Sequence, residues 1–305
     1  MFVDLLLIAA GLVILVVGGE FLVRGAVALA LRLGIAPLVV GLTVVAFGTS
    51  APEMIVSLSA ALRGATDLAM GNVVGSNIAN VLVILGISAL IAPIGTRAHD
   101  LRESWWMMVA ASVLLIALAL IGPLGPGQGV LLLAAMGLTL WRQLSTAGAG
   151  DADLPTGVAP WRNVLIWLAA GLVALPIGAH LLVTGATDIA RDLGVSEAVI
   201  GLTLVAIGTS LPEMAASVMA ALRGRSDLAL GNVVGSNIFN ILSILGITAI
   251  IKPLPIPEQM MRLDLWVMLG AALIMWPFLF RGITIGRATG AAMVAAYAAY
   301  VWVLL

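Results

Sequence analysis

Two near-identical stretches decide the fold: GLTVVAFGTSAPEM at residues 41–54 and GLTLVAIGTSLPEM at residues 201–214. Each stretch places one glutamate, Glu53 or Glu213, inside a long apolar segment. A charged side chain near the centre of a bilayer costs about 3 kcal/mol or more, so an acidic residue that occurs there twice needs a compensating partner. Cations are the partners that neutralise buried carboxylates, and the pair therefore indicates ion transport.

The composition is that of an integral membrane protein. Hydrophobic residues make up 62% of the 305 residues and charged residues 10%, with a mean hydropathy of +1.18, which is more apolar than soluble domains are. The net charge of −1 excludes a basic nucleic-acid-binding surface, and the absence of cysteine excludes disulfides and thiolate metal sites. We expect the bilayer itself to be the main partner of the chain.

A membrane-spanning window of about 20 residues predicts an all-α protein with ten transmembrane helices. The predicted spans lie near residues 2–32, 36–62, 68–92, 101–121, 127–144, 163–191, 196–222, 228–251, 260–280 and 283–304. The connection at residues 145–161 is rich in Gly, Pro and Asp and has no apolar periodicity, as in a polar linker. It separates a first five-helix repeat, residues 1–144, from a second, residues 162–305.

The two halves repeat with a constant offset of 160 residues. Between residues 41–87 and 201–247, 34 of 47 positions are identical. Five spans are an odd number, so the second half must enter the membrane from the opposite side, as in transporters built from inverted repeats. This arrangement predicts a substrate site at the membrane midplane, where the halves meet.

The distribution of basic residues predicts the orientation in a cell membrane. The connections on one side carry nine: Arg32, Arg97, Arg102, Arg142, Arg162, Arg223, Arg225, Arg281 and Arg287. The opposite side carries four: Arg63, Arg191, Lys252 and Arg262. Because cytoplasmic loops are enriched in Lys and Arg, we expect the linker to be cytoplasmic and both termini to be extracytoplasmic.

The two GTS-x-PE motifs supply candidate cation ligands. Pro52 and Pro212 have no N–H, so each helix opens one turn earlier and leaves carbonyl oxygens free. Hydroxyl groups stand beside the carboxylates in both motifs, on Thr49, Ser50, Thr209 and Ser210. Hard oxygen ligands of this kind suit Na⁺ or Ca²⁺ rather than a soft transition metal. The alternative is a proline-kinked helix whose glutamate only ties helices together.

A second pair of motifs, GNVVGSNIAN at residues 71–80 and GNVVGSNIFN at residues 231–240, follows each glutamate. Asn72, Ser76 and Asn80 are four residues apart, so they share one helix face, and the second half repeats the pattern. We predict that four of these residues are ligands: Ser76, Asn80, Ser236 and Asn240. We assign Gly75, Gly235, Asn77 and Asn237 to helix packing, in which small and amide residues are common.

The four motifs together resemble the α-repeats of the cation/Ca²⁺ exchanger superfamily, and the whole chain is similar to a prokaryotic Na⁺/Ca²⁺ exchanger. The resemblance implies that Glu53 and Glu213 bind Ca²⁺ with the help of Thr49 and Thr209, with Asn80 and Asn240 at the middle of the cluster. Flanking Na⁺ sites would comprise Ser50, Ser210, Ser76, Ser236 and the carbonyl groups of Ala46 and Ala206.

The same resemblance implies the function of a secondary antiporter that exchanges Na⁺ for Ca²⁺ by alternating access, at three to one as in the family. K⁺-dependent relatives carry aspartate where this chain has Asn240, which argues against K⁺ transport. An H⁺/Ca²⁺ antiporter and, less favoured, a passive cation channel are the alternatives. No nucleophile motif supports an enzyme, and we expect no cofactor and no obligate protein partner.

The first and sixth predicted spans are long and rich in glycine, as expected of helices that slide over the rest of the molecule. The repeat is broken at Glu20 and Arg24, which correspond to His180 and Thr184. Residues four apart on a helix are neighbours, so a local ion pair between Glu20 and Arg24 is the simplest prediction.

Overall fold

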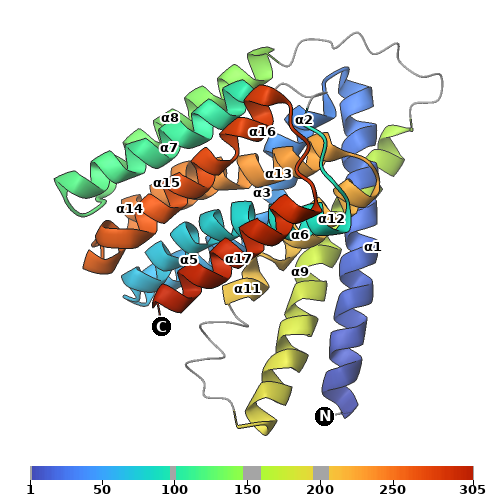
Figure 1. The fold of residues 1–305 in the computed structure, drawn as a ribbon, viewed down its shortest axis with the longest axis horizontal. Coiled ribbons are helices and arrows are strands. Elements are labelled where there is room, and N and C mark those ends of the chain that lie inside the picture. Colours follow the sequence, from blue (N-terminus) through green and yellow to red (C-terminus); the bar gives the residue numbers. More distant parts are fainter. Residues whose placement is uncertain (1, 97–100, 147–158, 195–205, 305) are drawn as a thin grey trace.

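The computed structural model describes residues 2–96, 101–146, 159–194 and 206–304, and these form a bundle of helices (Figure 1). The first half comprises α1 (Phe2–Leu33), α2 (Pro37–Val40), η1 (Gly41–Val45), α3 (Ala46–Thr49), α4 (Ala51–Leu62), α5 (Thr66–Ala79), η2 (Asn80–Leu85), α6 (Gly86–Ile91), α7 (Arg102–Ile121) and α8 (Pro126–Thr146). The second half comprises α9 (Trp161–Asp192), α11 (Ala206–Thr209), α12 (Leu211–Leu222), α13 (Ser226–Phe239), η4 (Asn240–Ile244), α14 (Leu245–Ile251), η5 (Met260–Asp264), α15 (Leu265–Ile274), α16 (Trp276–Arg281) and α17 (Arg287–Leu304).

Several of these helical segments can cross a bilayer. Within the described residues, seven are long and apolar enough, and the bent pair Pro37–Thr49 and Ala51–Leu62 makes an eighth if it counts as one span. The predicted span at 127–144 is helical as α8 but is not among them, since polar residues such as Gln128 and Gln143 shorten its apolar stretch. The predicted span at 196–222 lies partly outside the described residues. The fold is thus a multi-pass helical bundle, and the number ten stays a prediction.

The proline residues of the two GTS-x-PE motifs stand where helices are interrupted. The segment of α2 to α4 bends by 43° between Thr49 and Ala51, and Ser50 at the break has a non-helical ψ of 7°. Pro52 lies in the first turn of α4, where its missing N–H has no helical acceptor to lose. Ser210 has nearly the same conformation before α12, with φ −89° and ψ 5°. Both helices are therefore interrupted before the proline, as predicted, whereas the release of carbonyl oxygens stays a prediction.

The two longest helices, α1 and α9, pack against each other in antiparallel directions and lie beside the main bundle (Figure 1). Glycines permit this approach: a Cβ atom on Gly11 would lie 2.7 Å from the Gly178 carbonyl oxygen, and one on Gly25 would lie 2.8 Å from the Leu168 nitrogen. Small residues allow such close backbone contact in membrane helices. The outer face of α1 is exposed and apolar, as expected of a lipid-facing surface.

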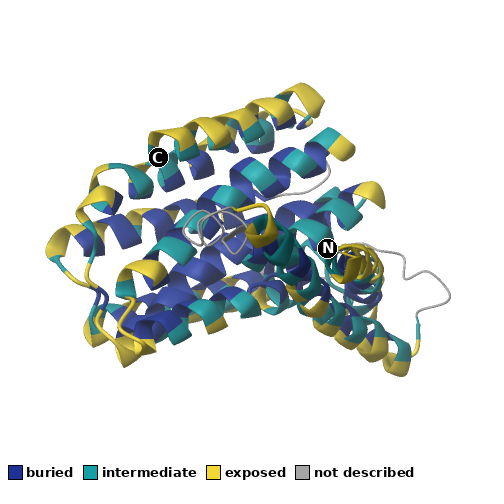
Figure 2. Ribbon diagram, turned by 90° about the horizontal axis from the view of Figure 1, so that it is seen from below, coloured by how far each residue is buried: buried dark blue, intermediate teal, exposed yellow. Residues whose placement is uncertain are grey.

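The helix α13 is buried along nearly its whole length, and buried residues gather in the middle of the bundle, where α5 also lies (Figure 2). Both helices continue into π-helical segments, which begin at Asn80 and at Asn240. Single π-helical turns are rare in proteins and are frequent at functional sites, because they redirect side chains and backbone carbonyl groups. The same irregularity at equivalent asparagines marks this central region as the place to look for a binding site.

The predicted ion pair between Glu20 and Arg24 is wrong. Glu20 instead accepts a hydrogen bond from Arg223, with 2.7 Å between Arg223 Nε and Glu20 Oε2. The guanidinium of Arg24 lies over the ring of Trp167, 5.3 Å from its centroid. Tertiary packing of α1 against the turn after α12 and against α9 thus offers both side chains better partners than each other.

Candidate cation-binding site

The two helix breaks bring Glu53 and Glu213 into one buried cluster. Ser50 Oγ donates to Glu213 Oε1 at 2.9 Å, and Ser210 Oγ donates to Glu53 Oε1 at 3.2 Å. Both glutamates are only 1% exposed. Each serine therefore crosses from its own half of the chain to the carboxylate of the other half, so the two carboxylates form one site.

Each carboxylate retains an oxygen without a protein partner. Five buried oxygens of this kind belong to the sequence-predicted ligands: Glu53 Oε2, Glu213 Oε2, Asn80 Oδ1, Asn240 Oδ1 and Ser236 Oγ. A buried polar atom without a hydrogen bond costs about 1–3 kcal/mol, and more if it is charged. Such atoms are uncommon in folded proteins, and each calls for a physical explanation. Hard oxygens are the atoms that Na⁺ and Ca²⁺ bind, and a cation would satisfy the set.

The orientation of the Asn80 and Asn240 amides is fixed by a second pair of asparagines. Asn80 Nδ2 donates to Asn237 Oδ1 at 2.9 Å, and Asn240 Nδ2 donates to Asn77 Oδ1 at 3.1 Å. Because the nitrogen end of each amide is held by a neighbour, the oxygen end is left unpaired. Asn77 and Asn237, which we assigned to packing, thus also orient candidate ligands.

Asn77 of α5 and Asn237 of α13 each approach the backbone carbonyl group of the other. Asn237 Nδ2 donates to the Asn77 carbonyl oxygen at 3.1 Å, and Asn77 Nδ2 lies 3.5 Å from the Asn237 carbonyl oxygen. The packing role that we predicted for these two residues is consistent with these cross-links between helices. Their orienting role was missed because its partners lie in the opposite half of the chain.

The backbones of the two glutamates are anchored by Asn72 and Asn232. Asn72 Nδ2 donates to the Glu53 carbonyl oxygen at 3.2 Å and to Ser57 Oγ at 2.8 Å. Asn232 Nδ2 makes the equivalent bonds at the other glutamate, to the Glu213 carbonyl oxygen at 3.2 Å and to Ser217 Oγ at 2.9 Å. These bonds fix each glutamate-bearing helix to the helix that follows it.

The remaining predicted residues of the first half lie around this cluster. Thr49 Oγ1 is 3.1 Å from both the Val45 carbonyl oxygen and Asn232 Oδ1. The Ala46 carbonyl oxygen accepts a bond from the Ser50 nitrogen at 3.0 Å and a longer one from Thr49 Oγ1 at 3.4 Å. Ser76 Oγ lies 3.4 Å from Ser210 Oγ. These residues therefore stand close to the paired serines and glutamates.

Two predicted residues of the second half are less fully described. Thr209 is the last residue of α11, next to Ser210. Ala206 is the first residue of α11, and its side chain lies outside the described residues. The prediction for the carbonyl group of Ala206 accordingly stays a prediction.

The formal charge of the cluster is set by two carboxylates. In the part of the chain that the structure describes, no group of three or more His, Asp or Glu side chains is placed to hold a metal ion. One divalent cation or two monovalent cations balance two negative charges. Buried charges without a partner are strongly destabilising, so the geometry favours an occupied site over an empty one.

Comparison with known proteins places these features in a family. The family model described as "Sodium/calcium exchanger protein" matches residues 3–145 and 163–305. The chain belongs to the sodium/calcium exchanger family. This confirms the resemblance found in the sequence and makes the protein a member of a family of membrane transporters.

Individual relatives of this exchanger match along nearly the whole chain. "Putative antiporter CaxA" of Alkalimonas amylolytica is 39% identical over 283 residues, which cover 90% of this chain and 88% of that protein. "Sodium/calcium exchanger MaX1" of Methanosarcina acetivorans is 34% identical, with 99% of this chain and 98% of that protein covered. A solved structure of the sodium-calcium exchanger NCX_Mj matches with a TM-score of 0.88 at 30% identity, covering 100% of this chain and 99% of that chain.

Proposed function

We propose that this exchanger is a secondary antiporter that moves Ca²⁺ against Na⁺ through the cluster between Glu53 and Glu213. The observation that carries the proposal is the set of buried oxygens without protein partners on both glutamates and on Asn80 and Asn240. MaX1 is named a sodium/calcium exchanger, and NCX_Mj was studied with Na⁺, Ca²⁺ and Sr²⁺. These names support the same pair of ions here.

In the proposed site the central Ca²⁺ lies between Glu53 Oε2 and Glu213 Oε2, near the amide oxygens of Asn80 and Asn240. Thr49 and Thr209 complete this central group. Flanking Na⁺ ions are assigned to the neutral oxygens of Ser50, Ser210, Ser76, Ser236, Ala46 and Ala206. Carboxylate, amide, hydroxyl and backbone carbonyl oxygens are all common ligands of hard cations.

Charge balance explains how one site couples two ions. One Ca²⁺ or two Na⁺ neutralise the two carboxylates, so the two cations exclude each other. An empty site carries two negative charges, and moving such charge through the low-dielectric core costs several kcal/mol. Only a filled site therefore crosses readily, which makes transport an exchange. At three Na⁺ for one Ca²⁺, one net charge moves per cycle, worth about 2.3 kcal/mol per 100 mV.

The proposed architecture is two inverted five-helix repeats, residues 1–144 and 162–305, joined by a cytoplasmic linker at 145–161, with both termini outside the cell membrane. The hydrogen bonds support the repeat: the bond from Asn72 to Glu53 recurs between Asn232 and Glu213, at an offset of 160 residues. In this proposal α1 and α9 slide together over the remaining helices and expose the site to each side in turn.

Substitution of the two glutamates tests the site. Glu53→Gln and Glu213→Gln each remove one negative charge but retain the shape and hydrogen-bonding capacity of the side chain. We expect each variant to lose at least about tenfold in Ca²⁺ exchange in proteoliposomes, since a lost buried charge partner costs more than 1.4 kcal/mol. Size-exclusion profiles and melting temperatures should stay near those of the wild type.

The matched control is Glu258→Gln, at an exposed glutamate paired with Arg262 and 77% exposed in its side chain. This variant should exchange Ca²⁺ at the wild-type rate. Exchange above a tenth of the wild-type rate in Glu53→Gln or Glu213→Gln would remove that glutamate from the proposed site.

A further inference from the structure

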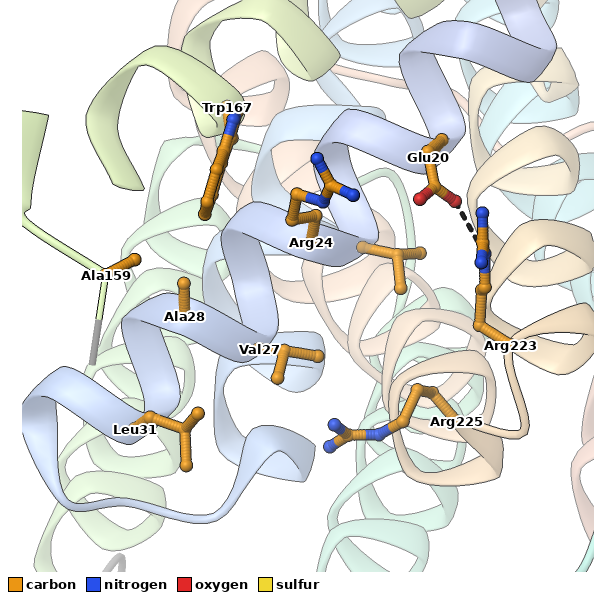
Figure 3. Close-up of a pocket in the computed structure, with 10 residues that line it drawn as sticks. Glu20, Arg24, Val27, Ala28, Leu31, Ala159, Trp167, Arg223 and Arg225 are labelled. Atoms are coloured by element: carbon orange, nitrogen blue, oxygen red, sulfur yellow. Dashed lines mark hydrogen bonds and ion pairs between the residues drawn. The ribbon is translucent and has the colours of Figure 1, made fainter. Parts of the chain in front are cut away.

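A cavity of about 380 Å³ lies away from the cation cluster (Figure 3). Its walls come from three elements: the second half of α1, the beginning of α9, and the turn that joins α12 to α13. Its lining residues are Glu20, Val23, Arg24, Val27, Ala28, Leu31, Ala159, Trp167, Arg223 and Arg225. None of these residues takes part in the cation site.

The cavity carries an excess of positive charge. Arg223 is paired with Glu20 at 2.7 Å, and Arg225 makes two bonds to Asp227, at 2.6 and 3.1 Å. Arg24 contacts the face of Trp167, and among the described residues its guanidinium has no carboxylate partner. Three guanidinium groups against two carboxylates leave one net positive charge on the wall of this cavity.

The same cavity is also lined by apolar side chains. Val27 and Leu31 lie along α1 on one side, and the ring of Trp167 lies on the other (Figure 3). Toward the N-terminus of α1, beyond Glu20, Val16 and Val17 are 57% and 46% exposed, so this part of the helix is an exposed apolar surface. A ligand that matches these walls combines an anionic head with an apolar tail.

We propose that this cavity binds the phosphate group of an anionic phospholipid. Guanidinium groups suit phosphate because their planar N–H donors bind two oxygens at once. Basic pockets between transmembrane helices are recognised sites for anionic headgroups. The phosphate lies between Arg24 and the arginines of the α12–α13 turn, and the acyl chains follow the apolar face of α1.

Such a lipid bridges the sliding pair of helices and the rest of the bundle. Arg24 belongs to α1, whereas Arg223 and Arg225 belong to the α12–α13 turn. A phosphate held by both groups stabilises the arrangement seen here and changes the rate of exchange. This effect on rate rests on the proposed function, whereas binding of the lipid does not.

Native mass spectrometry of the purified full chain tests binding. The probes are phosphatidylglycerol, phosphatidylcholine with the same acyl chains, and inorganic phosphate. We expect phosphatidylglycerol to be retained in preference to phosphatidylcholine, and Arg24→Gln to retain it about fivefold less, the effect of one arginine beside an anionic lipid. The control is Arg281→Gln, because the Arg281 guanidinium is similarly placed over the Trp276 ring at 5.8 Å but lies outside the cavity.

Three results would overturn the proposal: equal retention of the two lipids, equal loss in Arg24→Gln and Arg281→Gln, or retention of inorganic phosphate without retention of phosphatidylglycerol. The last result would make the cavity a site for soluble anions. A melting temperature measured without added lipid verifies that Arg24→Gln is folded.

Exchange assays in vesicles of the two lipids test the coupling separately. Phosphatidylglycerol should alter the exchange rate of the wild type and of Arg281→Gln, and should alter that of Arg24→Gln much less. A rate that is insensitive to lipid while binding is retained would refute the coupling. Absence of exchange in every lipid would contradict the proposed function and leave the binding result standing.

Discussion

Truncation of Asn237 to alanine should weaken Ca²⁺ binding without touching a proposed ligand. Asn237 is 3% exposed, and its Oδ1 accepts the bond from Asn80 Nδ2 at 2.9 Å. Without this acceptor the Asn80 amide is free to rotate in the empty site and to use either end for other contacts. Cation binding must then return Asn80 Oδ1 to its inward orientation.

The size of the effect follows from the loss of one buried hydrogen bond. An unpaired buried donor costs about 1–3 kcal/mol, which corresponds to a loss of about fivefold to 150-fold in affinity. The pseudo-equivalent variant Asn77→Ala, which frees Asn240 Nδ2, should show a loss in the same range.

Equilibrium binding of ⁴⁵Ca²⁺ to the purified protein measures this effect, with melting temperature as the check on folding. The matched control is Met108→Leu, because Met108 Sδ accepts from Asn237 Nδ2 at 3.6 Å, in addition to the Asn77 carbonyl oxygen at 3.1 Å. Leucine preserves the volume of methionine, and the control should bind Ca²⁺ within about twofold of the wild type, since a thioether is only a weak acceptor. Folded Asn237→Ala that binds within twofold, or a control that loses as much, would refute the orienting role.

Two further predictions concern charge and packing. Asn240→Asp should add a third negative charge to the cluster, so exchange by this variant should become slower and dependent on K⁺ or on low pH. The wild type should exchange equally with and without K⁺. A wild-type requirement for K⁺ in vesicle flux assays would contradict this prediction. Gly171→Ala should lower the melting temperature and slow exchange, because its Cβ would lie 2.7 Å from the Leu22 backbone and such overpacking costs about 1–3 kcal/mol. Gly270→Ala is the control, because no atom lies within 4 Å of its added Cβ. Equal melting temperatures for the two variants would contradict the prediction, since they would show that α1 and α9 separate easily.

Features that depend on local chemistry could be predicted from the sequence. The helix openings at Ser50 and Ser210 follow from a proline two residues later, and their place in one cluster follows from the repeat. The predicted end of the first span near residue 32 agrees with α1, which ends at Leu33. In these cases the cause lies within a few residues or in a repeat that is visible in the sequence.

Features that depend on partners far along the chain could not be predicted. Asn237 is hydrogen-bonded to Asn80, which is 157 residues away in the sequence, and Glu20 is hydrogen-bonded to Arg223, which is 203 residues away. The spacing of Glu20 and Arg24 allowed a local pair, but the position of α1 beside the α12–α13 turn favours the long-range one. The prediction of ten spans also depends on helices such as α8, whose polar ends make its length in the membrane ambiguous from composition alone.

The central claim, that Ca²⁺ moves only in exchange for Na⁺, is tested most directly by ⁴⁵Ca²⁺ uptake into proteoliposomes that contain the purified protein. Vesicles loaded with Na⁺ and diluted into Na⁺-free medium should accumulate ⁴⁵Ca²⁺, and the uptake should disappear when Na⁺ is equal on both sides. A K⁺-selective ionophore that sets an inside-positive potential should speed this uptake, if each inward Ca²⁺ exchanges for three outward Na⁺ and one positive charge leaves per cycle. Uptake that is independent of the Na⁺ gradient would contradict the account, and uptake driven instead by a proton gradient would replace Na⁺ with H⁺ as the exchanged ion.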